Sequence, residues 1–121
     1  MKKLLLFGAL AFGFNAFGQE TITVESKFDL SELRLYGRYG TEDEVYYINE
    51  SESSDFQLDY YEMMVERTLM SCSGEGSIKN GELLVKEFDG ACWGDEEFKI
   101  FFSIKDGIIS LVINGYYHPI N

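Results

Sequence analysis

The sequence predicts a small all-β domain, an antiparallel meander of about eight strands that forms a barrel or a strongly curled sheet. Short runs rich in Val, Ile, Phe and Tyr recur along the chain and alternate between apolar and polar residues. Asn-Gly and Asp-Gly pairs separate the later runs, and these pairs favour the positive φ angles of tight hairpin turns. Of the 121 residues, 45% are hydrophobic and one is proline, which favours a folded core over disorder.

The first eighteen residues have the layout of a bacterial secretory signal peptide. Two lysines precede the apolar run 4–14, and the small-x-small sequence Ala16-Phe17-Gly18 forms a cleavage site before Gln19. We therefore expect a signal peptide at 1–18 and one domain at 19–121, exported through the inner membrane and then periplasmic or secreted. Because Gln19 rather than a cysteine stands directly after the cleavage site, we expect no lipid anchor. No later run is apolar enough to span a bilayer, so we expect no membrane insertion.

The chain is strongly acidic, with 21 Asp and Glu residues against 10 Lys and Arg and a net charge of −11. This balance disfavours nucleic-acid binding, which depends on Lys and Arg to neutralise phosphates. It disfavours an anionic membrane surface for the same reason. A cationic protein would instead be attracted by long-range electrostatics. The alternative is that the acidic groups only keep the protein soluble.

The first half of the domain is expected to contain strands at 21–28, 33–39, 45–49 and 56–61, each separated from the next by polar residues. The segment 60–69 has two interpretations. Its apolar residues follow helical spacing, but they also alternate as two short strands separated by a bulge. We favour the strand because the neighbouring segments are all β-like.

The second half predicts three hairpins, which turn at Asn80-Gly81, Asp106-Gly107 and Asn114-Gly115. A two-residue turn also predicts which residues face each other across the hairpin. At the second turn, Phe102 lies opposite Leu111 within an apolar face. We expect this face to fill the barrel interior with side chains.

Cys72 and Cys92 are expected to form a structural disulfide. The register of the Asn80-Gly81 hairpin places Cys72 across from Asp89, and the short loop after Asp89 can return Cys92 to it. An exported protein folds in an oxidising compartment where disulfides persist. A redox pair or a metal site is the alternative, but C-x-x-C spacing is absent, and we expect no metal or cofactor.

Residue patterns that indicate catalysis are absent from the sequence. His118 is the only histidine, and its hairpin register places it opposite Leu111 on the inward face. A buried histidine that bonds to a neighbouring Tyr or backbone group explains it without catalysis. Acidic clusters such as 42–44 and 95–97 are too numerous for the proximity of two acids to identify a glycosidase pair. We expect a solvated acidic rim and a non-enzymatic protein.

Aromatic residues supply the candidate contacts with a partner, namely Trp93, Tyr46 and Tyr47. Adjacent tyrosines in a strand place one ring on each face of the sheet, and outward rings are common in interaction surfaces. Trp93 stands beside Cys92 in a loop. The alternatives are ordinary β-propensity for the tyrosines and, for Trp93, a ring packed over the disulfide.

Several motifs occur in an order that resembles a family of proteins. In chain order they are Tyr36-Gly37-Arg38-Tyr39, Val45-Tyr46-Tyr47-Ile48, Phe56-Gln57-Leu58, Gly74-Glu75-Gly76-Ser77-Ile78-Lys79-Asn80-Gly81, a cysteine in the next loop, and Phe98-Lys99-Ile100 before Asp106-Gly107. This order is similar to small exported bacterial β-barrels of the lipocalin-like and lysozyme-inhibitor-like types. The chain departs from their pattern at its end, which reads Tyr116-Tyr117-His118-Pro119. The resemblance implies a calycin-like barrel.

These observations lead to the expectation of an exported, non-enzymatic binding protein. In the version that the resemblance implies, an acidic rim binds or inhibits a cationic protein such as a lysozyme. One alternative is a carrier that holds a small apolar ligand in the barrel interior. Another is a structural or adhesive protein of the cell envelope. The sequence leaves the oligomeric state open.

Overall fold

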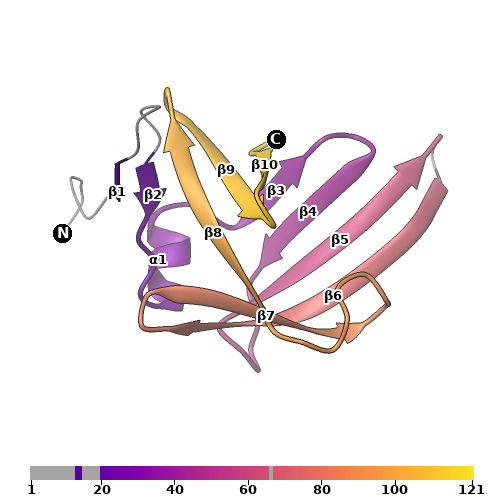
Figure 1. Ribbon diagram of the computed structural model, residues 1–121, viewed down its shortest axis with the longest axis horizontal. Coiled ribbons are helices and arrows are strands. Elements are labelled where there is room, and N and C mark those ends of the chain that lie inside the picture. The colour runs from indigo at the N-terminus through magenta and orange to yellow at the C-terminus, as the bar shows by residue number, and fades with distance from the viewer. Residues whose placement is uncertain (1–12, 15–19, 66) are drawn as a thin grey trace.

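The computed structural model describes residues 13–14, 20–65 and 67–121, which form one ten-stranded antiparallel sheet and a short helix (Figure 1). The predicted signal peptide and its cleavage site lie outside the described residues, apart from the two residues of β1. In chain order the elements are β1 (Gly13–Phe14), β2 (Glu20–Ile22), α1 (Lys27–Glu32), β3 (Gly37–Gly40), β4 (Glu44–Asn49), β5 (Phe56–Met64), β6 (Arg67–Lys79), β7 (Glu82–Asp89), β8 (Phe98–Lys105), β9 (Ile108–Ile113) and β10 (Tyr116–Pro119).

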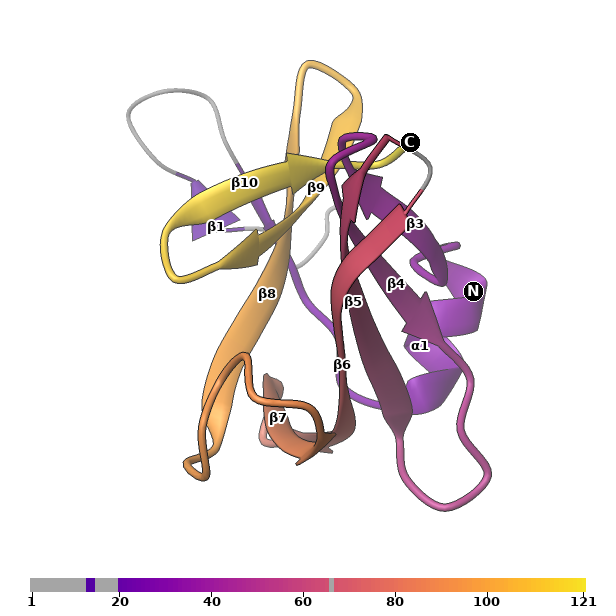
Figure 2. The same cartoon turned by 90° about the vertical axis from the view of Figure 1, so that its right-hand side faces the viewer.

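Strands β3 to β10 form a meander, because each pairs with the next along the chain in antiparallel orientation. The sheet curls until its ends meet (Figures 1 and 2). Tyr39 of β3 forms a bridge with Ile120, directly after β10. The backbone N–H of Asn121 donates to the carbonyl of Arg38 at 2.9 Å. The structure thus confirms the predicted all-β class as a meander in a nearly closed barrel.

The three predicted hairpins are confirmed, and so is their register next to each turn. At the second turn both central residues have positive φ, 52° for Asp106 and 80° for Gly107. Phe102 lies opposite Leu111, and both side chains are fully buried. In the last hairpin His118 lies opposite Leu111, as the turn predicts. Phe102 and Leu111 fill the part of the interior next to β8 and β9.

The strand expected at 21–28 is wrong beyond Ile22, because helix α1 begins at Lys27. The carboxylate of Asp29 accepts a hydrogen bond from the backbone N–H of Glu25 at 2.8 Å, and it stands in the first turn of the helix. An acidic group there interacts favourably with the helix dipole. Leu30, fully buried in the core, anchors the helix to the barrel.

The strand expected at 33–39 is also mostly wrong, because the residues after α1 form the end of the helix. The backbone N–H of Leu35 donates to the carbonyl of Leu30, and that of Arg34 donates to Ser31. Arg34 has a φ of 56° between these two bonds. This is the Schellman arrangement, in which the left-handed residue is usually glycine. Strand β3 begins only at Gly37.

Apart from the turn residue Val65, the described residues of the segment 60–69 are strand, as expected, and they form no helix. The segment supplies the end of β5 and the start of β6, which meet in a turn where Val65 has a φ of 41°. The register shifts between Glu62 and Met63, two residues later than the bulge that the pattern predicted between Tyr60 and Tyr61. Because the pairing is regular from Phe56 to Glu62, Tyr60 lies on the same face as Phe56, and both side chains are buried.

A glycine in β6 allows the barrel to pack tightly. A Cβ atom on Gly76 would overlap the ring of Phe56, which lies opposite it in β5 and is fully buried. The aromatic ring therefore occupies the space that a larger residue would need. Glycine inside a strand often marks such a close approach.

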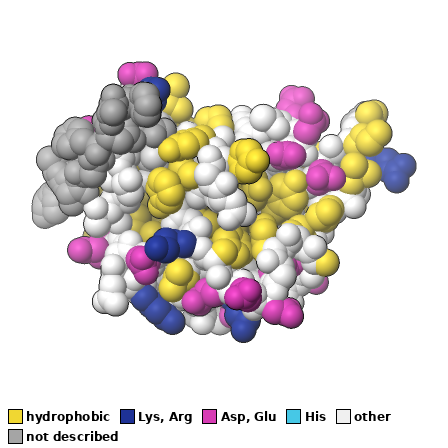
Figure 3. Space-filling model, in the orientation of Figure 1, with side chains coloured by type: hydrophobic (Ala, Val, Ile, Leu, Met, Phe, Trp, Pro, Cys, Tyr) yellow, Lys and Arg dark blue, Asp and Glu magenta, His cyan; other side chains and the backbone are white. Residues whose placement is uncertain are grey.

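Apolar and acidic side chains share the exposed face in Figure 3, where acidic groups border apolar ones. Part of this apolar surface is the tip of the β5–β6 hairpin, where Met64 is 57% exposed and Val65 is 84% exposed. Within the described ranges, no helix combines the length and apolar character that crossing a bilayer requires.

Candidate functional site

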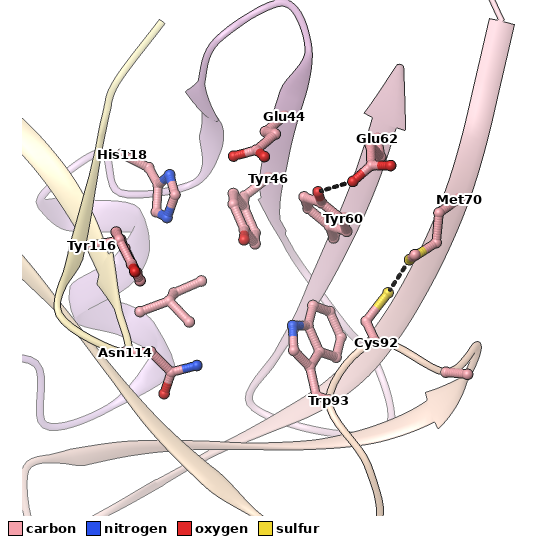
Figure 4. A pocket seen from close by; sticks show the side chains of 12 residues that line it. Glu44, Tyr46, Tyr60, Glu62, Met70, Cys92, Trp93, Asn114, Tyr116 and His118 are labelled. Carbon is pink, nitrogen blue, oxygen red and sulfur yellow. Dashed lines mark hydrogen bonds between the residues drawn. The ribbon is translucent and has the colours of Figure 1, made fainter. Parts of the chain in front are cut away.

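A pocket of about 480 Å³ lies between the β9–β10 hairpin, strands β4 to β6 and the loop that follows β7 (Figure 4). Its lining combines aromatic rings with carboxylates and includes no Lys or Arg among the described residues. We call it the aromatic pocket. The residues that line it are Glu44, Tyr46, Tyr60, Glu62, Met70, Ala91, Cys92, Trp93, Ile113, Asn114, Tyr116 and His118.

Strands β4 and β5 supply two rings and two carboxylates to the same wall of the pocket. Tyr46 lies opposite Tyr60, and Glu44 lies opposite Glu62. The centroids of the two tyrosine rings are 4.6 Å apart. Because residues two apart on a strand share a face, each carboxylate stands next to a ring on its own strand and faces the other carboxylate across the pair.

Further rings extend this wall on both sides (Figure 4). The imidazole of His118 lies 4.5 Å from the ring of Tyr46, measured between centroids. On the other side, the indole of Trp93 lies 6.4 Å from the ring of Tyr60 and 5.3 Å from that of Phe98. Tyr46 of β4 and His118 of β10 are far apart in the sequence, and they meet here only because the barrel closes.

The predicted disulfide between Cys72 and Cys92 is confirmed, with the two Cα atoms 6.1 Å apart. Near Cys72, the predicted register of β6 against β7 is wrong by one residue. Ser73 rather than Cys72 lies opposite Asp89, because the pairing shifts in the middle of β6. The disulfide joins the loop after β7 to β6, and it places Trp93 on the wall of the pocket.

The sulfur atoms at the edge of the pocket belong to this disulfide and to a methionine. The Sδ atom of Met70 lies 3.2 Å from the Sγ atom of Cys92. Since a disulfide sulfur carries no hydrogen, this is a contact between sulfur atoms and not a hydrogen bond. The carboxylate of Glu87 lies within 4.8 Å of both cysteine sulfurs. A metal would require free thiolates, which the disulfide removes.

Glu87 holds the loop that carries Trp93. One of its carboxylate oxygens accepts hydrogen bonds from the backbone N–H groups of Trp93 at 2.7 Å and Gly94 at 3.1 Å. The other oxygen accepts one from Cys92 at 3.0 Å. Burial acts to raise the pKa of Glu87, but these three hydrogen bonds outweigh it and lower the pKa. The charged carboxylate is thus the form that orders the loop.

The carboxylates of the pocket form no salt bridge with a Lys or Arg of the described residues. No ion pair in the described part of the chain involves Glu44 or Glu62, and the pair that the structure does contain joins Lys99 to Glu82. Glu62 accepts a long hydrogen bond from the Tyr60 hydroxyl at 3.4 Å. Two negative charges therefore face each other across β4 and β5 without compensation.

Burial favours the uncharged forms of Tyr46, Tyr60 and His118. Burial, together with the nearby charges of Glu44 and Glu62, raises the pKa of Tyr60 to about 12. Burial also raises the pKa of Tyr46, and Glu44 adds to this effect. Burial lowers the pKa of His118, although Glu44 acts in the opposite direction. The electrostatic potential of the pocket is therefore set by its two carboxylates.

The structure separates the three residues that the sequence suggested as partner contacts. Trp93 and Tyr46 line the aromatic pocket. Tyr47 lies on the opposite face of β4, beside a second hollow that Tyr61 and Asp59 also line. Asp59 is buried there, and Ser73 donates a hydrogen bond of 2.5 Å to its carboxylate. The adjacent tyrosines of β4 thus serve opposite faces of the sheet, as alternation requires.

Sequence reasoning did not place Glu44, Glu62, Tyr60 and Tyr116 in a site. A local signal exists for three of them, because the order Glu-x-Tyr in β4 and Tyr-x-Glu in β5 puts acid and ring on one face of each strand. Nothing local indicates that the β9–β10 hairpin covers the same face.

No protein-family model, curated protein or solved structure matches this chain. The chemistry of the site therefore rests on its own residues. Neutral aromatic rings attract cations through their π faces, and unpaired carboxylates attract them through charge. The aromatic pocket combines both kinds of group within one concave surface.

Proposed function

We propose that this protein is an exported, non-enzymatic binding protein that engages a cationic protein, such as a lysozyme, through the aromatic pocket and the acidic surface around it. The observation that carries the proposal is the lining of the pocket, in which Glu44 and Glu62 stand among aromatic rings without a Lys or Arg. The net charge of −11 supports it, since a basic partner would be drawn toward the whole surface.

Export is part of this proposal. It rests on the signal-peptide layout of residues 1–18 and on the Cys72–Cys92 disulfide, which is consistent with an oxidising compartment. Periplasmic and secreted forms of the protein would both meet basic proteins outside the cytoplasm.

The carrier alternative has less support. Interior side chains such as Phe102, Leu111 and Ile100 are at most 1% exposed, so they fill the interior that an apolar ligand would occupy. The remaining cavity is lined by carboxylates and by polar groups such as Asn114. An apolar ligand would leave those groups without water or a hydrogen-bond partner.

The test is binding of a basic lysozyme to the purified protein, measured by calorimetry at about 50 mM and about 500 mM salt, because salt screens exposed charges. We expect binding at low salt that weakens about tenfold or more at high salt. Equal affinity at both salt concentrations, or no binding to any basic protein of a tested panel, would contradict the proposal.

A pair of matched variants locates the contact. The double substitution Glu44→Gln and Glu62→Gln removes two charges from the pocket. The control, Glu50→Gln with Glu52→Gln, removes two exposed charges from the loop between β4 and β5, which does not line the pocket. We expect the first variant to weaken binding more than the control, although both change net charge equally.

A further inference from the structure

We infer that the aromatic pocket takes one organic cation, an alkylammonium or guanidinium group of the kind that ends a lysine or arginine side chain. This inference rests on the proposed function and names what enters the site. It concerns the pocket itself, whereas the proposed function also involves the acidic surface around it. The two can therefore fail separately.

The arrangement of rings is the first support. The Tyr46 ring lies between His118 and Tyr60, with centroid distances of 4.5 and 4.6 Å, and Trp93 continues the wall beyond Tyr60. Tyr116 lines the pocket from the β9–β10 hairpin (Figure 4). A cation within about 6 Å of several ring centroids is attracted by each of their π faces.

The position of the carboxylates is the second support. Glu44 and Glu62 are direct cross-strand neighbours, and like charges in that position repel each other. A cation beside them would interact with both carboxylates at once. Figure 4 shows both side chains at the same side of the pocket, next to the rings of Tyr46 and Tyr60. The charge that is uncompensated in the free protein would thus be neutralised by the ligand.

The third support is the size and polarity of the space. A volume of about 480 Å³ exceeds what a bare metal ion would fill. A metal ion would also need several oxygen, nitrogen or sulfur ligands close together. Among the described residues such a group is formed by Cys72, Glu87 and Cys92, but the disulfide removes the two thiolates. Ammonium and guanidinium groups are both attracted by aromatic faces, and the guanidinium group is also the more weakly hydrated of the two. Met70 and Ile113 offer apolar contacts to an alkyl stem.

Trp93 makes the inference directly measurable, because it is the only tryptophan of the chain and it lines the pocket. The probes are the blocked amino acids N-acetyl-lysine methylamide and N-acetyl-arginine methylamide. Their uncharged counterpart, N-acetyl-norleucine methylamide, has a similar apolar stem. We expect both cationic probes to change the Trp93 fluorescence saturably and the norleucine probe to have no effect at the same concentrations.

Two variants then test the charge of the pocket. Glu44→Gln with Glu62→Gln keeps the shape of the pocket, and we expect it to weaken probe binding about tenfold. The matched control at Glu50 and Glu52 should bind the probes like the unmodified protein. If the double variant were misfolded, the single substitutions Glu44→Gln and Glu62→Gln each remove one charge from the pocket, and each should weaken probe binding.

A second experiment asks whether the cation is a free amine or the side chain of a protein. It uses cadaverine, a free diamine, and a lysozyme whose lysines have been acetylated. Tight cadaverine binding with no effect of lysine acetylation would indicate a free amine as ligand. Loss of lysozyme binding on acetylation, with weak cadaverine binding, would indicate a protein side chain. Both results support a site for an organic cation.

The inference is overturned if neither cationic probe nor cadaverine alters Trp93, or if the norleucine probe binds equally well. Probe binding that is unchanged by the pocket variant would overturn it too, and salt-sensitive lysozyme binding in that case would leave the proposed function intact on another surface. Conversely, probe binding without binding of any basic protein would support the site and contradict the proposed function.

Discussion

Replacing Glu87 with glutamine tests how the loop that carries Trp93 is held. One oxygen of this carboxylate accepts two backbone N–H groups and the other accepts a third. A glutamine side chain has one oxygen and one NH₂ group, so in either orientation at least one N–H loses its acceptor and faces another donor. The remaining hydrogen bonds also lose their charge assistance.

The expected loss follows from this count. One hydrogen bond at a partly exposed site contributes about 0.5–1.5 kcal/mol, so Glu87→Gln should lower the free energy of unfolding by about 1–2 kcal/mol. The control is Glu82→Gln on the same strand. Its carboxylate is 2.7 Å from Lys99, but both side chains are more than half exposed, and such a pair contributes less than about 1 kcal/mol.

The assay is urea denaturation with Trp93 fluorescence as the signal. Because the pKa of Glu87 is lowered in the folded protein, its stabilisation is present above its ordinary pKa of 4.5 and is lost as pH falls through the folded value. The variant should lack this part of the acid sensitivity. Equal stability of the two variants, with an unchanged Trp93 emission spectrum in Glu87→Gln, would refute the assignment of Glu87 as the group that holds the loop.

Three further predictions concern packing and titration. Gly76→Ala should cost about 1–3 kcal/mol, measured by thermal unfolding, because its Cβ would overlap the Phe56 ring; an unchanged melting temperature would contradict this. Phenolate absorbance should show Tyr60 titrating near 12, and because its folded pKa is raised, its contribution to stability is present below its ordinary value of 10 and lost as pH rises toward 12. Proton NMR should place the midpoint of His118 below 6.5, with stability lost as pH falls through that midpoint; a midpoint above 6.5 would show that Glu44 outweighs burial.

The hairpins were predictable from sequence because their register depends on short-range geometry. In Asp106-Gly107, two residues that tolerate positive φ fix the turn, and the pairing of Phe102 with Leu111 then follows by counting. The same counting failed at Cys72, where a shift in the β6 pairing moves Asp89 opposite Ser73. A bulge of this kind changes which residues lie opposite each other across the hairpin, but the alternation of residue types along the strand does not reveal it.

Helix α1 could not be predicted because its end carries an atypical residue. The left-handed position after it is held by Arg34, where glycine would have marked the boundary. Apolar residues on either side of that position, such as Leu33 and Leu35, alternate with polar ones as they would in a strand. The helix is instead stabilised by the burial of Leu30 in the core, which is a tertiary contact.

The candidate site shows the same division between local and long-range information. Alternation along β4 indicates that Tyr46 and Tyr47 face opposite sides, and the structure places them so. The contact of Tyr46 with His118 depends on closure of the barrel through the bridge between Tyr39 and Ile120. No sequence pattern near Tyr46 or His118 indicates that the barrel closes.

The central claim is that the aromatic pocket binds a cationic group of a partner. The most direct measurement is the affinity of a basic lysozyme for the unmodified protein, for the Glu44→Gln and Glu62→Gln variant, and for the matched variant at Glu50 and Glu52. We predict that the pocket variant binds about tenfold more weakly than the matched variant, which should remain close to the unmodified protein. Identical affinities for the two variants would contradict the claim.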